Sequence, residues 1–482
     1  MARLRKQEMR AGIGYDDARN MRRILGAVAA AALVVGSLSA IHSSETRPDV
    51  IILLTDQQRA DAFGAGGSPE IRTPTMDRLA REGVLFRRAF VATPQCSPSR
   101  AALLTGWYPH RTGVMGNTLE GANAGGPPPE GMSPSLNQSL PTIGHAFSAA
   151  GYDTAYFGKW HLGSTPRNYG FETHDVKVDD PTLAERAAAF LRTRQSAAPN
   201  KPLLLIVAWL NPHDVYGALK ATPDARLMES ARLPTNLVDP LDDKPFPQRH
   251  YLQDDQGKPF VGAASDVWRR YRAFYNGLVE TVDRQIGVLL AAIPRRDVPP
   301  LVVFSSDHGD LGGAHGLPFK GPAMYEELVR VPLVISWPGR VRPAASDALV
   351  SLIDVLPTLC DLAGVTAPAG DGLSLRPLLD GRSRDWRRDM IFSEYYGKQS
   401  WRVPIRMVRT PRWKYVRYVE YGEELYDLET DPGELRNLAR APRAAKERIR
   451  LARALDDWIE RTADPFPRLT VTDRAGRVIT AQ

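Results

Sequence analysis

The chain has 482 residues, 43% of them hydrophobic and 24% charged, which is the composition of an ordinary globular protein. This excludes a low-complexity chain, and the length allows a large core and two domains. The net charge is +7 at pH 7, but residues 1–40 contribute seven Lys and Arg against three Asp and Glu, which leaves +3 for the rest. We therefore expect no nucleic-acid partner.

The N-terminal segment has the pattern of an export signal. Arg22-Arg23 precedes an apolar run over residues 24–41, as in a secretory signal peptide. The run is also just long enough for an uncleaved membrane anchor. We therefore predict that residues 1–47 form an N-terminal extension with a signal peptide or a membrane anchor. The protein is expected to be periplasmic or secreted, and residues 24–41 would tether it to the membrane if they are not cleaved.

From residue 50 onward, short apolar runs alternate with segments of helical periodicity. Continuous apolar runs indicate buried strands, and their alternation with helices predicts an α/β fold with a large, mostly parallel sheet between helices. The predicted strands are 50–55, 84–91, 154–157, 203–210, 301–304 and 331–336, and the predicted helices are 74–81, 141–150, 183–194, 267–286 and 352–362.

Ionisable side chains follow four of these strands. Ligands bind at the carboxyl ends of strands in such sheets, so we expect these side chains to form one site. They are Asp56 after the first strand, Lys159 and His161 after 154–157, His213 after 203–210, and Asp307 and His308 after 301–304.

Two segments fit no regular element. Residues 115–140 are rich in Gly, Pro, Asn and Ser, and residues 216–263 are polar and contain several prolines. Loops of this length are usually functional or disordered. Near the site they would shape substrate choice, and a plain surface insertion is an equal alternative.

The sequence pattern changes after residue 381. Short strand-like runs at 390–395, 405–409, 413–419 and 424–428 precede a helix over 443–461. This predicts a smaller C-terminal α+β subdomain with an antiparallel sheet. We place the catalytic domain at 48–381 and the subdomain at 382–482.

The chain has two cysteines, and they have different surroundings. Cys360 lies in a helical run on the same face as Leu356 and Leu359, which suits a small buried hydrophobe and leaves Cys96 free. Cys96 lies just ahead of a predicted helix N-terminus, which favours anions, and Arg100 adds a cation. A reactive group beside an anion site is a catalytic arrangement, whereas this pair alone is also compatible with a buried cysteine next to an arginine.

The sequence motif around Cys96 indicates a family. Cys-x-Pro-x-Arg followed by Ala-Ala-Leu-Leu-Thr-Gly, at residues 96–106, resembles the signature of the type I, formylglycine-dependent sulfatases. The match continues over most of the chain, from about 48 to 438, and includes Leu-Tyr-Asp-Leu-Glu-Thr-Asp-Pro-Gly-Glu at 425–434. The resemblance implies an alkaline phosphatase-like fold and a sulfuric ester hydrolase.

The resemblance also implies a modified residue and a metal. A formylglycine-generating enzyme would oxidise Cys96 to an aldehyde, and one hydroxyl of its hydrate would attack sulfur. Ca²⁺ is the expected cation, with Mg²⁺ and Mn²⁺ as alternatives. The positions that match the family's metal site are Asp56, Gln57, Cys96, Asp307 and His308.

The remaining roles implied by the resemblance involve charge and proton transfer. Lys159 and Lys320 would hold sulfate oxygens, and Arg100 would steady residue 96. His161 would assist its deprotonation and His213 would be the general acid near the leaving oxygen. His315 is expected at the rim, and four residues are expected as indirect supports or substrate contacts: Arg59, Asp61, Glu326 and Glu327.

The sequence departs from the commonest pattern at two positions. Gln57 stands where many members have aspartate, and His308 where many have asparagine. A branch resembling choline sulfatases and phosphonate monoester hydrolases also carries an Asp-Gln pair. Hydrolysis of a phosphonate monoester or phosphodiester is therefore the alternative to hydrolysis of a sulfated small molecule or glycan, and an inactive binder of sulfated glycans is a third hypothesis. The sequence does not predict the oligomeric state.

Overall fold

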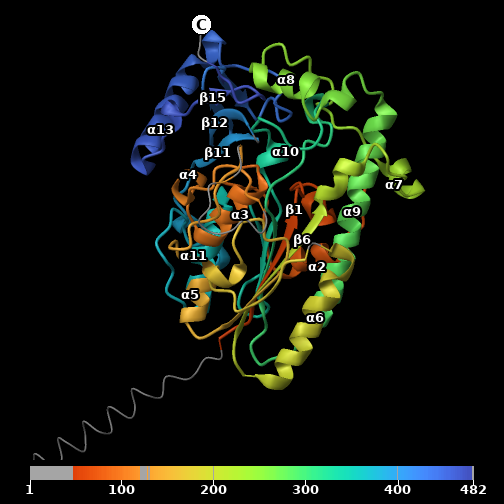
Figure 1. Cartoon of the computed structure of the whole chain (residues 1–482), viewed down its shortest axis with the longest axis vertical. Helices are drawn as coiled ribbons and strands as arrows, with labels where there is room; N and C mark the ends of the chain where they lie inside the picture. Colours follow the sequence, from red (N-terminus) through yellow and green to blue (C-terminus); the bar gives the residue numbers. More distant parts are fainter. Residues whose placement is uncertain are drawn as a thin grey trace, which may run out of the picture. The chain divides into compact units, whose positions relative to one another are not determined.

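The fold is built on an eight-stranded sheet (Figure 1). The computed structural model describes residues 47–119, 128, 131–177, 179–198, 200–398 and 400–479, so the predicted signal or anchor at 24–41 lies outside the described residues. None of the described helices is long and apolar enough to cross a membrane. The sheet contains β1 (Val50–Asp56), β2 (Val84–Phe86), β4 (Asp153–Gly158), β5 (Thr173–Asp175), β6 (Leu203–Pro212), β7 (Leu301–Ser306), β8 (Leu333–Ser336) and β9 (Ala344–Ser346).

The strands are ordered β5-β4-β6-β1-β7-β8-β2-β9. The first five run parallel to one another, and β8 is antiparallel to both β7 and β2. Alternate side chains of β1 enter two separate cores, because Ile52 packs on one face of the sheet and Leu53 on the other. The predicted mostly parallel sheet, covered on both faces, is confirmed.

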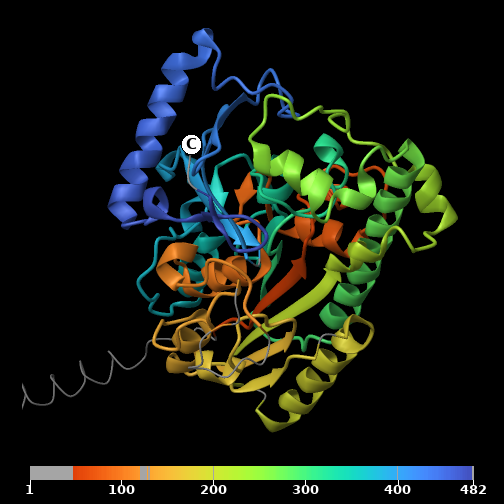
Figure 2. The same ribbon diagram turned by 45° about the horizontal axis from the view of Figure 1, so that its top comes forward.

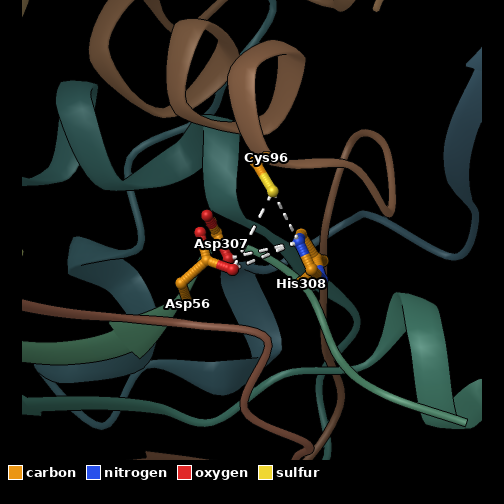
Figure 3. A group of neighbouring side chains, drawn as sticks. All are labelled: Asp56, Cys96, Asp307 and His308. Atoms are coloured by element: carbon orange, nitrogen blue, oxygen red, sulfur yellow. Dashed lines mark hydrogen bonds and ion pairs between the residues drawn. The ribbon is translucent and has the colours of Figure 1, made fainter. Parts of the chain in front are cut away.

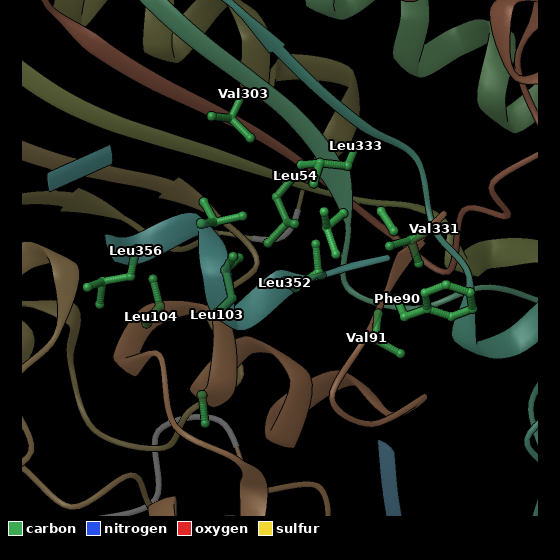
Figure 4. Packing of buried hydrophobic residues seen from close by; sticks show 14 of the residues in the cluster. Leu54, Phe90, Val91, Leu103, Leu104, Val303, Val331, Leu333, Leu352 and Leu356 are labelled. Atoms are coloured by element: carbon green, nitrogen blue, oxygen red, sulfur yellow. The ribbon is translucent and has the colours of Figure 1, made fainter. Parts of the chain in front are cut away.

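Helices form a layer on each face of the sheet. One layer contains α2 (Pro74–Glu82), α6 (Asp180–Ala197) and α9 (Ser265–Ala291), with α6 and α9 side by side in both views (Figure 2). The other contains α3 (Cys96–Thr105), α5 (Ile143–Ala149) and α11 (Val355–Ala363). Figure 4 shows Leu103 and Leu104 of α3 beside Leu352, just before α11, and Leu356 of α11, with the sheet residue Leu54 above Leu352 in this view.

The N-terminus of α3 is fixed by burial along the whole helix. All ten of its residues are buried, and it ends at Gly106, whose φ of 72° suits a left-handed cap. Cys96 is the first residue of this helix, and Cys360 lies in α11. Both cysteines are buried and free, which agrees with the predictions that Cys360 is buried and that Cys96 is left free.

The C-terminal region forms a second sheet, as predicted. It contains β11 (Ile391–Lys398), β12 (Trp401–Arg409), β13 (Trp413–Tyr418) and β14 (Gly422–Asp427), all antiparallel. The helix α13 (Ala445–Thr462) packs against β12 and β13, and β15 (Val471–Thr472) pairs with β16 (Val478–Ile479). Residues from Pro48 onward form one compact unit, and the boundary at residue 381 stays a prediction.

Two predictions of local structure are wrong. The strand predicted at 84–91 is divided, because its second part, β3 (Ala89–Phe90), pairs instead with β10 (Val350–Ser351) in a separate sheet. The segment 216–263 contains α7 (Ala225–Ser230) and α8 (Phe246–Asp254), which are too short and polar to show helical periodicity. The described residues of 115–140 form neither helix nor strand. The other short helices are α4 (Pro109–Thr112), α10 (Glu326–Val329) and α12 (Arg376–Leu379).

A buried histidine joins the C-terminal region to the rest of the unit. His110 of α4 has Nδ1 2.6 Å from Glu394 Oε1 and Nε2 3.1 Å from the carbonyl oxygen of Thr462. A carboxylate and a carbonyl oxygen accept hydrogen bonds, so both contacts are complete when both ring nitrogens carry a hydrogen, as in the imidazolium form. Burial lowers the pKa of His110, but the hydrogen bond and charge of Glu394 raise it above its usual value overall.

We predict that this contact stabilises the protein most at low pH. A histidine whose pKa is raised by folding contributes its full stability below the unfolded pKa of about 6.5, and loses it as the pH rises through the folded pKa. His110→Gln should therefore lower the free energy of unfolding by about 2 kcal/mol at pH 6 and by less at pH 9. Urea unfolding at the two pH values measures this. His250→Gln, at a more exposed Asp254 pair, is the control, and an equal loss for His110→Gln at both pH values would contradict the prediction.

Candidate active site

Four neighbouring parallel strands deliver polar side chains to one edge of the sheet. β4, β6, β1 and β7 are adjacent in that order. Lys159 follows β4, His213 follows β6, Asp56 ends β1, and Asp307 follows β7. Because parallel strands end together, the sheet itself brings these groups to one place.

The centre of the site is a buried cluster of four side chains (Figure 3). Asp56, Cys96, Asp307 and His308 each place one donor atom within 4.8 Å of the others. Cys96 Sγ lies 3.3 Å from His308 Nε2 and 3.8 Å from Asp56 Oδ1. Cys96 therefore points from the start of α3 directly at the carboxylates and the imidazole.

The orientation of His308 suits a metal ligand. Its Nδ1 lies 2.8 Å from the carbonyl oxygen of Gly309, which only accepts, so Nδ1 carries a hydrogen. Nε2 then faces Asp56 at 3.7 Å and Asp307 at 3.6 Å. A backbone carbonyl that fixes one ring nitrogen is the usual support for a histidine that binds metal through the other.

Arg100 ties the two carboxylates together. Its Nε donates to Asp307 Oδ2 at 2.8 Å and its Nη2 to Asp56 Oδ2 at 3.2 Å. Nη1 donates to the carbonyl oxygen of Lys159 at 2.7 Å, and Tyr156 donates to that oxygen at 2.6 Å. The planar guanidinium thus links the ends of three strands through one rigid group.

Two lysines enter the cluster from different elements. Lys159 Nζ lies 2.5 Å from Asp56 Oδ2. Lys320 Nζ lies 3.1 Å from Cys96 Sγ and 2.8 Å from Gln57 Oε1. Gln57 itself has a φ of 73°, in the left-handed region, and its backbone N–H donates to Asp307 Oδ1 at 3.2 Å. Such backbone persists only where surrounding contacts hold it.

The surroundings shift the pKa values of the two carboxylates in opposite directions. Burial raises the pKa of both. For Asp56 the charge of Lys159, together with smaller contributions from His213, Lys320 and His308, more than offsets burial, and the pKa lies well below its usual value. For Asp307 the negative charge of Asp56 adds to the effect of burial, and the pKa rises to about 6. A divalent cation between them would favour the ionised form of both, and their oxygens with His308 Nε2 fit such a cation.

His161 and His213 are half-buried and therefore more exposed than the four residues of the cluster. The carbonyl oxygen of His161 accepts a hydrogen bond from Thr118 at 3.0 Å. The ring of His213 lies 5.0 Å from the ring of Tyr216, which stacks on Phe319 at 4.2 Å. Burial and the charge of Lys320 lower the pKa of His213 to about 3, so its ring is neutral at pH 7.

The structure corrects the prediction that His315 lies at the rim. His315 is fully buried, its Nδ1 lies 2.7 Å from Asp239 Oδ2, and it stacks on Tyr325. The residues expected as supports or substrate contacts, Arg59, Asp61, Glu326 and Glu327, line a separate cavity of about 220 Å³ with Arg330 and Arg409.

Sequence reasoning gave no role to three residues that shape the site: Tyr156, Tyr216 and Asp310. Tyr216 lies three residues after His213 in a segment without a clear pattern. Asp310 directly follows the Asp307-His308-Gly309 motif, and its proximity to that motif was the available signal.

Comparisons with known proteins identify a family. A family model described as Sulfatase matches residues 48–365, and one described as N-sulphoglucosamine sulphohydrolase, C-terminal, matches 313–461. The chain is 30% identical over 460 residues to the Delta 4,5-hexuronate-2-O-sulfatase of Bacteroides thetaiotaomicron, covering 90% of this chain and 93% of the relative. It is also 30% identical over 459 residues to the choline-sulfatase of Rhizobium meliloti, covering 84% and 85%.

Solved structures give the same result. A 2-O GAG sulfatase superposes with a TM-score of 0.77 at 30% identity, over 90% of this chain and 97% of that one. The phosphonate monoester hydrolase of Agrobacterium radiobacter superposes with a TM-score of 0.68 at 23% identity, over 90% and 100%, which shows a shared fold.

We predict that Arg100 is essential for stability because it compensates two buried carboxylates. Arg100→Met should lower the free energy of unfolding by about 3–5 kcal/mol, the usual cost of leaving a buried charge without its partner. Arg100→Lys should recover only part of this, because one ammonium cannot span Asp56 and Asp307 as the fork does. Urea unfolding measures both. Arg167→Met, at an exposed pair with Glu172, is the control, and full stability of Arg100→Lys would contradict the bridging role.

Proposed function

Because the chain belongs to the sulfatase family, whose enzymes hydrolyse sulfate esters, we propose that it cleaves a sulfate ester with formylglycine derived from Cys96 and a divalent cation. The observation that carries the proposal is the position of Cys96, which lies 3.1 Å from Lys320 and 3.3 Å from His308 beside two buried carboxylates. The residues that would hold the cation are Asp56, Gln57, Asp307 and His308, together with residue 96.

The modified residue and the cation supply the chemistry that the unmodified side chains lack. When they are present, the hydrate of formylglycine supplies the attacking hydroxyl and the cation supplies a Lewis acid. We propose Ca²⁺, because three of the four protein side chains offer hard oxygen donors. The nitrogen of His308 also suits Mn²⁺, and Mg²⁺ is the third alternative.

The other side chains bind and orient the sulfate. Lys159 reaches the cluster from the end of β4 and Lys320 from the loop after β7, so their ammonium groups would hold sulfate oxygens where negative charge develops. Arg100 would keep Asp56 and residue 96 in place through its contacts with both carboxylates. His161 would take a proton from residue 96.

His213 would give a proton to the leaving oxygen, and this role needs a bound substrate. Lys320 is part of the reason why the pKa of His213 is low. A sulfate ester bound to Lys320 would offset that positive charge and raise the pKa of His213. The general acid would then be protonated mainly when substrate is present.

Two measurements test the reaction. After expression with a formylglycine-generating enzyme, the proteolytic peptide that contains residue 96 should have the mass of the aldehyde. The purified enzyme should release sulfate from an ester panel, and Cys96→Ala should abolish turnover while leaving the urea midpoint unchanged. Release of no sulfate by aldehyde-containing enzyme, or full activity of Cys96→Ala, would contradict the proposal.

A phosphonate monoester or phosphodiester hydrolase is the second candidate, and the Asp56-Gln57 pair favours it. Gln57 stands where many members have aspartate, and the branch that resembles phosphonate monoester hydrolases carries the same Asp-Gln pair. Rates on a phenyl sulfate and a matched phenyl phosphonate decide between the two. Faster phosphonate cleavage would establish the second candidate.

We propose a sulfated glycan as the substrate class. The support is the 30% identity to a hexuronate 2-O-sulfatase and to a 2-O GAG sulfatase. Tyr216 adds a flat aromatic surface beside Lys320, whose Nζ lies 6.0 Å from the ring centre, and such a surface suits a sugar ring. A small sulfated molecule is the alternative, because the choline-sulfatase is similarly close.

Lys398 is suited to a second negative charge on the substrate. It ends β11, contacts the side-chain oxygen of Gln256, and has no ion pair within the described part of the chain. Burial and the charge of Lys320 lower the pKa of Lys398 to about 8. Lys320 disfavours the charge of Lys398 and Asp255 favours it, so a uronate or a second sulfate bound between the two lysines would stabilise the charged form of Lys398.

We predict that Lys398→Met distinguishes doubly charged from singly charged substrates. Loss of one charge-assisted hydrogen bond, about 1.5–3 kcal/mol, should lower kcat/KM on a sulfated hexuronate roughly ten- to hundredfold. Activity on phenyl sulfate, which has no second charge, should change less than threefold. Lys258→Met, at an exposed lysine, is the control. Equal losses on both substrates would contradict a role in recognising a second anion.

A further inference from the structure

A glutamine at a cation site has a problem that aspartate does not. Its side-chain amide is nearly symmetric in shape, and a half-turn exchanges the oxygen for an NH₂ group. With the NH₂ turned inward, two hydrogens would face the cation in place of a lone pair. The site therefore needs a second group that binds the NH₂ and fixes the amide.

In this chain that group is Asp310. Gln57 Nε2 donates to Asp310 Oδ2 at 2.7 Å, and a carboxylate only accepts. The oxygen of the amide is thereby turned the other way, where it accepts from Lys320 Nζ at 2.8 Å. Gln57 and Asp310 both have no exposed surface, so water does not compete for these hydrogen bonds.

Asp310 is in turn fixed by Tyr271 of α9. The Tyr271 hydroxyl lies 2.9 Å from each carboxylate oxygen of Asp310, to which it donates. The same hydroxyl accepts from the backbone N–H of Phe319 at 3.0 Å. Phe319 precedes Lys320 in the chain, so the contacts close a ring that runs from Gln57 through Asp310, Tyr271 and Lys320 back to Gln57.

A second tyrosine of α9 fixes the backbone of Gln57. The hydroxyl of Tyr275, one helical turn after Tyr271, donates to the carbonyl oxygen of Gln57 at 2.9 Å and accepts from the N–H of Arg59 at 2.8 Å. It thereby supports the left-handed backbone at Gln57. α9 thus holds both the main chain and, through Asp310, the side chain.

We propose that Asp310 and Tyr271 are positioning residues that select one orientation of the Gln57 amide and so present Oε1 to the cation site. The inference rests on the proposed function, because it assumes that Gln57 binds the cation. It also predicts that positions 57 and 310 depend on each other: a carboxylate at 57 would meet the carboxylate of Asp310 with no hydrogen between them.

A matched pair of variants separates the acceptor from the charge. Asp310→Asn and Asp310→Leu both remove one negative charge and keep a side chain of the same length and branching, leucine being the larger, but only asparagine keeps an oxygen that accepts from Gln57 Nε2. We expect Asp310→Leu to weaken Ca²⁺ or Mn²⁺ binding by about 10–100-fold, the usual cost of losing such a support, and Asp310→Asn by less than a third of that factor. Tyr271→Phe should weaken binding severalfold. Calorimetric titration of the full-length, formylglycine-containing protein with each cation alone measures these affinities.

The same pair in a Gln57→Leu background tests whether Asp310 acts through Gln57. Without the amide, the difference in affinity between Asp310→Leu and Asp310→Asn should disappear. A merely structural role would preserve that difference, and this result would overturn the inference, as would equal affinities of the two variants when Gln57 is present. Urea midpoints verify that each variant is folded, and Tyr271→Phe serves as the milder variant if Asp310→Leu is not.

The controls also separate this inference from the proposed function. If the unaltered protein binds neither cation, the proposed metal site is wrong and the inference falls with it. If the unaltered protein binds a cation and the two Asp310 variants bind equally well, only the inference is overturned. Turnover of a sulfate ester is not needed for either conclusion.

Discussion

The structure depends on two buried carboxylates held close together. Asp56 and Asp307 end adjacent strands, so the sheet places two negative charges where water cannot screen them. An arrangement of this kind is stable only if cations compensate it. Arg100 meets both carboxylates and Lys159 meets Asp56. Arg100 belongs to α3 and Lys159 follows β4. The fold therefore brings both cations to the carboxylates from different elements.

A third cation, Lys320, is held near the carboxylates by contacts with α9 and with the segment 216–263. Lys320 lies on the loop after β7, and that loop is fixed by Tyr271 of α9 and by the contact of His315 with Asp239. The segment 216–263 therefore does more than cover the surface, because Asp239 and Tyr216 both belong to it. His110 also joins separate elements, because its ring connects α4 to Glu394 of β11 and to the carbonyl oxygen of Thr462 at the end of α13.

The fold and the centre of the site could be predicted for one physical reason. β1, β4, β6 and β7 are buried on both faces, so they appear in the sequence as continuous apolar runs, and the polar residue after each run marks the edge of the sheet. α7 and α8 could not be predicted in this way because they are short and lack a regular apolar face. The burial of His315 depends on Asp239, 76 residues earlier in the chain, and no local pattern encodes that contact. Asp310 was overlooked because its partner is an amide, whose need for an acceptor appears only in three dimensions.

The charges of the site also support the proposed modification of residue 96. In the unmodified chain, burial and Asp56 raise the pKa of Cys96, but Lys159 and Lys320 lower it well below its usual value. These cations favour the ionised form of the Cys96 thiol. Under the proposed function, conversion of Cys96 to an uncharged aldehyde would remove that ionisable group, and the proposed divalent cation would add positive charge beside it. The lysines would then face an excess of positive charge in a buried space, which a bound anion such as sulfate would offset. The proposed modification would therefore create the nucleophile and free the lysines for the anion in the same step.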